Sequence, residues 1–296
     1  METYVTKIAL VTGANKGIGY AIVRNLALRY AQRSSDDLPL TIFMTARDPN
    51  LGQESLKKVK QELKSKQILK DENGKVDIKF LRMDLTDEES IKEVKQVLEN
   101  ENGLDILINN AAIAFKGNQF DINVVHTTLE TNFYGTLNVC NQLYPLIRPN
   151  GRLINISSGL GKLSTLKSSE LQKKFTQEDL DIDELIGLIK KFENDVENDQ
   201  WTKEGWPSQA YGVSKVGVIA MSKIFARRAD SEGKNIFVHA CCPGWVATDM
   251  GGPNAPRNID QGAETPVYLA LDEDVVPKTK NGEFWQYEKV IPCAIK

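Results

Sequence analysis

Two residues four positions apart, Tyr211 and Lys215, form a pair that can handle a proton. They open a helix-like segment over 209–230, and residues four apart lie on one face of a helix. A free phenol has a pKa of about 10 and is a poor acid at pH 7, but a nearby ammonium lowers that pKa by favouring the phenolate. The pair is therefore a candidate general acid, although aromatic and basic residues at this spacing also occur on many helices without a function.

Three glycines follow the first short apolar run of the chain. Gly13, Gly17 and Gly19 lie in the string TGANKGIG, between a strand-like run over 8–12 and a helix-like segment over 17–30. Glycines allow a tight turn and a close approach of backbone to a pyrophosphate, and a helix N-terminus supplies N–H donors. The spacing differs from the standard G-x-G-x-x-G. Simple turn chemistry is the alternative, but the position between a strand and a helix favours a dinucleotide site.

The residues after the second apolar run, over 40–45, indicate which dinucleotide binds. An arginine there accepts the 2′-phosphate of NADP, whereas a carboxylate bonds to the ribose hydroxyls of NAD and repels that phosphate. The chain has Arg47 at this place, and Lys16 adds a positive charge in the glycine turn. NADP(H) is therefore favoured over NAD(H). Asp48 is the counter-argument, because a shift of one residue would put its carboxylate where Arg47 is expected.

Short apolar runs alternate with longer helix-like segments, which is typical of a parallel sheet covered by helices on both faces. The runs lie at 8–12, 40–45, 76–82, 105–109, 152–157 and 236–241, and the helix-like segments at 17–30, 51–66, 88–100, 124–147 and 209–230. The sequence thus predicts the α/β class, a doubly wound, Rossmann-like parallel sheet in a single domain over 1–296. A polar loop at 31–39, a helical insertion at 159–208 and a glycine- and proline-rich substrate loop at 243–259 interrupt the rhythm.

Composition narrows the function classes. The 296 residues carry 37 Lys and Arg against 40 Asp and Glu, a net charge of −3, and no long basic run, so nucleic acid is not an expected partner. No stretch is apolar enough for a membrane span and no leader is recognisable, so we expect a cytoplasmic protein. Four cysteines make no disulfide framework, and two isolated histidines give no metal site.

Over nearly its whole length the sequence resembles the short-chain dehydrogenase/reductase superfamily. The motifs in that family's order are Thr12–Gly19, Asp84 with Leu85, Asn109–Ala112, Asn132, Ile156–Ser158, Tyr211 with Lys215, and Pro243 with Gly244. Their combination is highly specific. The departure is Ala112, where the family usually has glycine, and its methyl group could tighten the backbone there.

The resemblance implies a role for each residue. Tyr211 would donate a proton to a carbonyl oxygen, Ser158 would hydrogen-bond that oxygen, and Lys215 would lower the pKa of Tyr211 and bind the nicotinamide ribose. Asn132 would anchor a water that links Lys215 to solvent. Negative charge develops on the oxygen as hydride arrives at carbon, so oriented donors stabilise the transition state. Ser158 is chosen over Ser157 because the family's catalytic serine is the second of this pair.

The same resemblance implies a set of cofactor-binding residues. Asp84 would hold the adenine and Asn110 would lie along the adenosine, while Thr248 would face the carboxamide and pyrophosphate. The alternative for Asp84 is an N-cap of the following helix. The full set is Gly13, Asn15, Lys16, Gly17, Ile18, Gly19, Arg47, Asp84, Leu85, Asn110, Tyr211, Lys215, Pro243, Gly244, Val246 and Thr248.

Within the superfamily, four strings are similar to monomeric NADPH-dependent carbonyl reductases: AYGVSK at 210–215, EGWP at 204–207, ACCPGW at 240–245 and GAETPVY at 262–268. Such enzymes reduce quinones, aromatic ketones and aldehydes. Trp206, Trp245 and Met250 are the candidate substrate residues, because they offer flat apolar surface. Packing between insertion and core is the alternative for Trp206. Sepiapterin-type or plant-type ketone reductases remain the alternative function, and a non-catalytic NADPH sensor is a third possibility.

Two further hypotheses concern the region after Ser158. The insertion places 52 residues between Ser158 and Tyr211 and carries an apolar stripe at helical spacing, with Leu180, Leu185, Ile186, Ile189 and Phe192. Such a helix would cover the surface through which shorter relatives dimerise, so we expect a monomer; a mobile lid is the alternative. Near the substrate loop, one thiol of Cys241 and Cys242 could be open to alkylation, or both could be inert core residues.

Overall fold

The computed structural model describes residues 5–33, 38–117, 119–272 and 280–292. Positions 34–37 of the expected polar loop and Cys293 lie outside these ranges. An eight-stranded sheet with the order β3-β2-β1-β4-β5-β6-β7-β8 forms the centre of the described part. Neighbouring strands from β3 through β7 run parallel, and β8 pairs antiparallel with β7. The doubly wound α/β fold predicted from the sequence is confirmed.

The strands are β1 (Lys7–Val11), β2 (Leu40–Ala46), β3 (Val76–Arg82), β4 (Leu104–Asn109), β5 (Ile147–Ile156), β6 (Phe237–Cys242), β7 (Phe284–Gln286) and β8 (Lys289–Val290). The predicted runs match the first six to within a few residues. The chain adds β2 and β3 on one side of β1, then crosses to β4 on the other. Ligands of open α/β sheets bind at such a switch point, beyond the carboxyl ends of the strands.

The helices are α1 (Gly17–Ala31), α2 (Pro49–Lys64), α3 (Glu88–Asn100), α4 (Ile122–Leu129), α5 (Thr136–Leu143), α6 (Ser169–Lys174), α7 (Ile182–Glu197), α8 (Trp201–Glu204), α9 (Ala210–Glu232) and α10 (Ile259–Leu271). Shorter 3₁₀ turns lie at Lys70–Glu72, Tyr144–Leu146, Gly159–Gly161 and Leu163–Thr165, and a π-helical turn at Glu130–Gly135.

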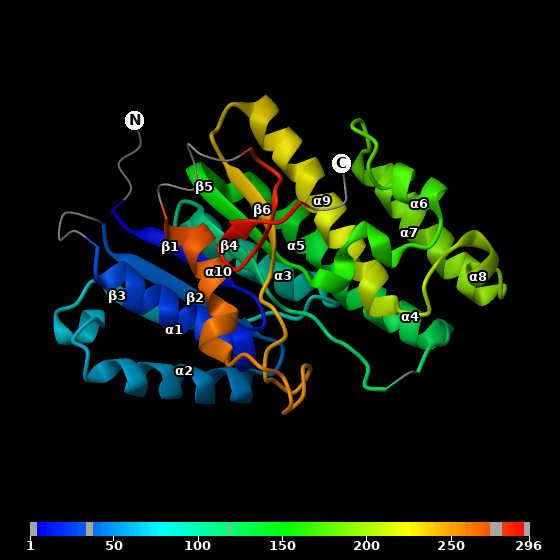
Figure 1. Ribbon diagram of the computed structural model, residues 1–296. Helices are drawn as coiled ribbons and strands as arrows, with labels where there is room; N and C mark the ends of the chain where they lie inside the picture. The colour runs from blue at the N-terminus through cyan, green and yellow to red at the C-terminus, as the bar shows by residue number, and fades with distance from the viewer. Residues whose placement is uncertain (1–4, 34–37, 118, 273–279, 293–296) are drawn as a thin grey trace.

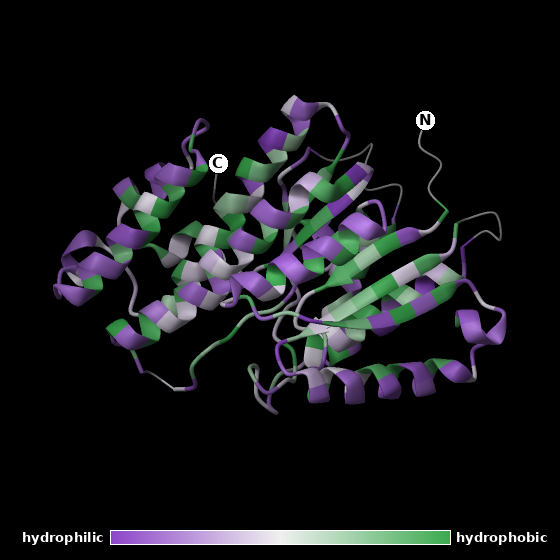
Figure 2. Ribbon diagram, turned by 180° about the vertical axis from the view of Figure 1, so that it is seen from behind, coloured by the Kyte–Doolittle hydropathy of each residue, from purple (hydrophilic) through white to green (hydrophobic). Residues whose placement is uncertain are grey.

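The helices form two layers (Figure 1). Helices α1, α2 and α10 pack on one face of the sheet, and α3, α4, α5 and α9 on the other. Strand β1 shows how the sequence serves both layers: Ile8 and Leu10 point into one core, Ala9 and Val11 into the other. The central strands are apolar while the helices carry polar residues outward (Figure 2). No helix of the described ranges is both long and apolar enough to cross a membrane.

The single helix expected over 124–147 is wrong in detail. The chain forms α4, the π-helical turn and α5, and β5 already begins at Ile147. Pro145 lies in the 3₁₀ turn after α5, and a proline cannot continue an α-helix because it lacks the N–H donor. Helix α10 was not predicted, although Asn258 and Gln261 form a capping box at its start. That spacing is the sequence signal for this helix.

The insertion at 159–208 contains α6, α7 and α8. Helix α7 begins at a capping box of Asp181 and Glu184 and packs against α9 and α4. Its buried side chains are Leu185, Ile189, Phe192 and Val196. The apolar stripe expected from the sequence therefore lies inward, against the helix that carries Tyr211 and Lys215. This packing agrees with a covering helix.

Candidate active site

The glycine turn closes tightly over the end of β1. Gly13 and Gly17 have φ of +61° and +58°, a region that side chains with a Cβ rarely adopt. A Cβ on Gly13 would lie 2.8 Å from the Cα of Ala111, and one on Gly19 would lie 2.4 Å from the carbonyl oxygen of Gly13. These glycines are therefore required by the fold of the turn. They leave backbone, without side chains, at the N-terminus of α1.

Asn110, directly after β4, fastens this turn to the sheet. Its side-chain amide donates to the carbonyl oxygens of Thr12 (2.9 Å) and Gly13 (3.1 Å), and its backbone N–H donates to the Thr12 hydroxyl. Both amide hydrogens are thus engaged with the turn, so the Asn110 side chain holds the glycine turn against the end of β4. Ala112 is not among the described residues that have a positive φ. Its backbone is therefore not in the left-handed region where a Cβ causes strain, and alanine can take the place of the family's usual glycine.

The end of β2 separates the roles of Arg47 and Asp48. Strand β2 ends at Ala46, and Arg47 follows as an exposed residue. The Asp48 carboxylate caps α2, accepting from the backbone N–H groups of Asn50 (2.8 Å) and Leu51 (3.1 Å). Both side chains are exposed, but the Asp48 carboxylate is bonded to the start of α2, so Arg47 is the residue next to the strand end that can meet a phosphate. The geometry thus favours the arginine alternative.

Asp84 follows β3 but does not cap α3. Asp87 is the N-cap, its side chain accepting from the N–H of Ser90. The Asp84 carboxylate instead accepts from the backbone N–H and the hydroxyl of Thr86, at 3.0 and 2.8 Å. The N-cap alternative for Asp84 is therefore wrong. Next to it, Leu85 is buried and contributes to the core.

The two serines after β5 face different partners. The Ser157 hydroxyl is buried and donates to the carbonyl oxygen of Lys215 at 3.0 Å, which joins β5 to α9. Ser158 caps the following 3₁₀ turn, accepting from the N–H of Leu160, and its hydroxyl hydrogen-bonds Tyr211 in the sense that lowers the pKa of the phenol. Ser158 is therefore the serine at the phenol, and Ser157 holds the helix in place.

The pKa of Tyr211 moves in the direction opposite to the expectation. Burial raises it to about 12, Cys242 adds to the rise, and the hydrogen bond with Ser158 opposes it, although part of the ring stays open to a cavity. The Lys215 ammonium lies 5.6 Å from the centre of the Tyr211 ring and donates to the carbonyl oxygen of Ile156 at 2.9 Å. Burial lowers the pKa of Lys215 to about 8. Lys215 therefore does not make the phenol acidic in this structure.

Asn132 lies in the π-helical turn and is fully buried. Its side-chain oxygen accepts from the N–H of Ile113 at 2.8 Å, and its amide donates to Ile113 O (2.9 Å) and to the Ser214 hydroxyl (3.2 Å). Both amide hydrogens are thus used within the protein, so the side chain clamps the segment after β4 to α9. The expected water link cannot run through these hydrogens.

A cavity of about 220 Å³ opens beside Tyr211. Its lining comes from the segments after β4 and β5, from α4 and from the start of α9: Phe115, Gly117, Gln119, Val124, Thr128, Leu160, Ser208, Gln209, Ala210, Tyr211 and Gly212. Phe115 and Leu160 are apolar yet 43% and 50% exposed, as expected for residues at the rim of a ligand cavity. Sequence reasoning missed both. Their positions just after strands β4 and β5 were the available signal.

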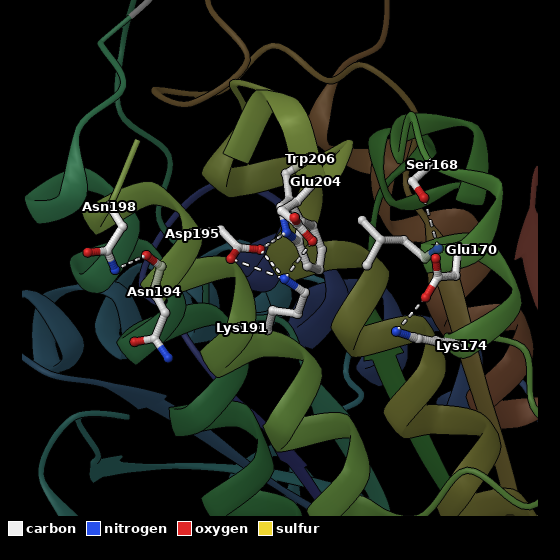
Figure 3. Close-up of polar contacts among 10 residues, drawn as sticks. Ser168, Glu170, Lys174, Lys191, Asn194, Asp195, Asn198, Glu204 and Trp206 are labelled. Carbon is white, nitrogen blue, oxygen red and sulfur yellow. Dashed lines mark hydrogen bonds and ion pairs between the residues drawn. The ribbon is translucent and has the colours of Figure 1, made fainter. Parts of the chain in front are cut away.

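Trp206 does not line this cavity. The ring is 1% exposed and packs against Phe175 and Phe192, and its Nε1 donates to Asp195 at 2.7 Å. Figure 3 shows this bond beside the ion pairs of Lys191 with Asp195 and Glu204. The proposal of Trp206 as a substrate residue is therefore wrong, because the ring is buried in the core that the insertion shares with α4 and α9.

Trp245 and Met250 lie on the substrate loop and are 58% and 43% exposed. The cavity beside Tyr211 is lined by other residues, so these two exposed side chains do not belong to its lining. A larger hollow of about 450 Å³ is lined by Thr86, His126, Thr127, Glu130, Thr131 and Glu193, none of which belongs to the expected site. In the described ranges no cluster of His, Cys, Asp and Glu has the geometry of a metal site.

Cys241 and Cys242, the last two residues of β6, are both buried. The Cys242 sulfur accepts from the backbone N–H groups of Gly159 (3.2 Å) and Gly244 (3.3 Å) and from Nε2 of Gln286 (3.4 Å). Burial raises the pKa of both thiols. This setting favours the inert-core reading, and alkylation of Cys242 stays a prediction.

Comparison with known proteins agrees with this geometry. A family model described as short chain dehydrogenase matches residues 7–169, more than half of the chain. Carbonyl reductase (NADPH) 1 of Sus scrofa is 44% identical over 288 residues, covering 95% of this chain and 91% of that protein. The enzyme of the same name from Homo sapiens is 44% identical over 272 residues, covering 89% and 90%. The chain belongs to the short-chain dehydrogenase family, so the resemblance noted in the sequence is confirmed.

A solved structure shares the fold over nearly the full length. Salutaridine reductase from Papaver somniferum has a TM-score of 0.78 at 22% identity, covering 95% of this chain and 99% of its own. At this identity the likeness speaks for the fold alone.

Proposed function

We propose that the protein reduces carbonyl compounds to alcohols with NADPH. The observation that carries the proposal is the meeting of Ser158, Tyr211 and Lys215 at the carboxyl edge of the sheet, beside a cavity and on the same edge as the glycine turn. The 44% identity to carbonyl reductase (NADPH) 1 supports the same reaction.

The residues fit the cofactor that this reaction needs. Close packing around Gly13 and Gly19 leaves only backbone at the N-terminus of α1, where a pyrophosphate is favoured by N–H donors and the helix dipole. Arg47 is exposed at the end of β2, and Lys16 is exposed within the glycine turn. Two cations at these places favour the extra phosphate that distinguishes NADPH from NADH. NADPH, when bound, supplies the hydride.

The protein's own groups manage the proton and the developing charge. With a pKa of about 12, Tyr211 keeps its hydroxyl proton at pH 7 and is in the form that donates it to the carbonyl oxygen. The Ser158 hydroxyl donates a hydrogen bond to the same carbonyl oxygen and stabilises the negative charge that forms on it. Lys215, charged below about pH 8 and buried beneath Tyr211, places a positive charge close to the reacting groups.

The substrates are small carbonyl compounds with an apolar body, in line with Phe115 and Leu160 at the cavity rim. Measurement of NADPH consumption with a quinone, an aromatic ketone, an aldehyde and a pterin tests this proposal. We expect turnover of the apolar carbonyls. A protein that binds NADPH but reduces none of these compounds would contradict the proposed activity and favour a non-catalytic sensor, and a preference for the pterin would favour the sepiapterin-type alternative.

The same proposal includes a monomer in the cytosol. Helix α7 buries its apolar face against α9 and α4, within the chain, which supports the covering-helix explanation. Cys140, Cys241 and Cys242 are free thiols, as is usual in reducing compartments. Light scattering during size exclusion would contradict the monomer if it gave twice the chain mass. Cell fractionation tests the location.

A further inference from the structure

An ion pair joins two parts of the site that are 233 positions apart in the sequence. Lys16 Nζ in the glycine turn lies 2.7 Å from a carboxylate oxygen of Asp249 in the substrate loop, and the two side chains are 69% and 78% exposed. The residues next to them also lie close together. A Cβ built on Gly17 would lie 3.3 Å from a methyl carbon of Thr248. The loop thus lies directly along the turn where the cofactor phosphates are expected.

The loop meets the glycine turn as a compact unit. Trp245 Nε1 donates to the carbonyl oxygen of Gly251 (2.8 Å), the N–H of Gly251 donates to the Thr248 hydroxyl (3.1 Å), and Gly252 N–H donates to Thr248 O (2.8 Å). These bonds close a turn around Asp249. A restraint on Asp249 is therefore passed to the whole turn, including the exposed residue Trp245.

The electrostatics make Asp249 a competitor of a bound phosphate. The Lys16 ammonium, aided by Lys116, holds the pKa of Asp249 below its usual range, so the carboxylate is charged at neutral pH. One ammonium cannot give its full charge to a carboxylate and to a phosphate at once, and a phosphate beside Asp249 also meets like charge. The partner that Lys16 has in this structure is thus one that an incoming phosphate must replace.

We propose that Asp249 is a determinant of cofactor affinity. Its carboxylate forms an ion pair with Lys16 in the free protein, and this ion pair must break when NADP(H) binds. The Asp249 carboxylate thereby weakens cofactor binding. It also couples cofactor binding to the loss of the ion pair between Lys16 and the substrate loop. This inference rests on the proposed NADPH site and adds a residue that opposes binding.

Isothermal titration with NADP⁺ tests the inference without turnover. We expect D249N to bind NADP⁺ about three- to fivefold more tightly than wild type, the size typical of an exposed ion pair. D249E keeps the charge and should stay near wild type. E170Q is the matched control, because Glu170 on α6 is 77% exposed and pairs with Lys174 far along the chain in the insertion. It should bind NADP⁺ as wild type does.

A double-mutant cycle with K16M identifies the cause. If Asp249 acts by occupying Lys16, D249N improves binding much less in the K16M background than in wild type. The inference would be overturned if D249N bound NADP⁺ no more tightly than wild type, or if E170Q gained as much affinity as D249N. It would also be overturned if D249N improved the affinity of the K16M variant as much as that of wild type. Wild-type protein that fails to bind NADP⁺ at all would instead contradict the proposed function, and with it the basis of this inference.

Discussion

The nucleotide-binding region, from β1 to β4, and the catalytic region, from β5 to α10, are built in different ways. In the first, the expected cofactor residues lie at or just after strand ends: Gly13, Arg47 and Asp84 follow β1, β2 and β3, and Gly17, Ile18 and Gly19 open α1. In the second, Ser158 and Tyr211 come from elements separated by a 50-residue insertion. The residues expected at the nucleotide thus follow successive strands in the first half of the chain, whereas those expected at the reaction site lie on either side of the long insertion.

The contacts within each region differ in kind. Asp48 caps the helix that follows it, and the glycine turn is bonded by Asn110, which is 98 positions away in sequence and directly follows the neighbouring strand β4. Around the reaction site the decisive bonds cross between distant elements: Ser157 to Lys215 O, Lys215 to Ile156 O, and Asn132 to Ser214. Changes in the two regions should therefore have separable effects on cofactor binding and on turnover.

Tyr211→Phe should give the largest difference between the effect on turnover and the effect on cofactor binding. Removal of the proton donor should lower kcat by roughly 10²–10⁴-fold, while the Kd for NADPH, measured by fluorescence titration, stays unchanged. Tyr134→Phe is the control, because the Tyr134 hydroxyl bonds Glu193 away from the site. A Tyr211→Phe variant that keeps more than about a tenth of wild-type kcat would remove Tyr211 from the role of general acid.

Phe192→Ala tests whether the insertion is part of the core. The side chain is fully buried beside Trp206, so its loss should lower the free energy of unfolding by about 3–5 kcal/mol in urea denaturation. Lys190→Ala, on the exposed side of the same helix, should change it by less than about 0.5 kcal/mol. Equal free energies of unfolding for the two variants would support the mobile-lid alternative. The insertion would then not contribute to the stability of the core.

Arg47→Asp should change binding in the nucleotide region while the chemistry persists. Loss of a charge-assisted phosphate contact should weaken NADPH relative to NADH by roughly ten- to hundredfold, as read from the two Kd values. Asp48→Ala is the neighbouring control: it removes the cap of α2, costs about 1 kcal/mol of stability and should leave the cofactor preference unchanged. An unchanged preference in Arg47→Asp would show that the end of β2 does not select the cofactor.

A pH profile probes the buried lysine of the catalytic region. Burial lowers the pKa of Lys215 from 10.5 to about 8, so the ammonium is present below that pH and lost above it. The value of kcat/KM for NADPH, which reports the free enzyme, should fall about tenfold per pH unit above 8. Lys215→Arg keeps its charge and should lack this limb. A limb near pH 8 that persists in the arginine variant would assign it to another group.

The sequence predicted the nucleotide region closely because its signals are local. Continuous apolar runs fix the strands, and the glycine spacing fixes the turn, so β1–β4 match the expected runs to within about a residue at each end. The catalytic residues were found through their family motifs. The short strands β7 and β8 and helix α10 were missed, since two- and three-residue strands carry no periodicity and Pro266 disguises the helix.

What the sequence by itself determined is the order of the first six strands, the glycine turn and the identity of the residues that meet at the site. Tertiary structure alone decided how those residues behave. Trp206 entered a core because the insertion folded over it, and burial by distant segments raised the pKa of Tyr211 where a neighbouring lysine alone would lower it. Spacing along the chain shows which groups share a helix face, but desolvation depends on everything packed around them.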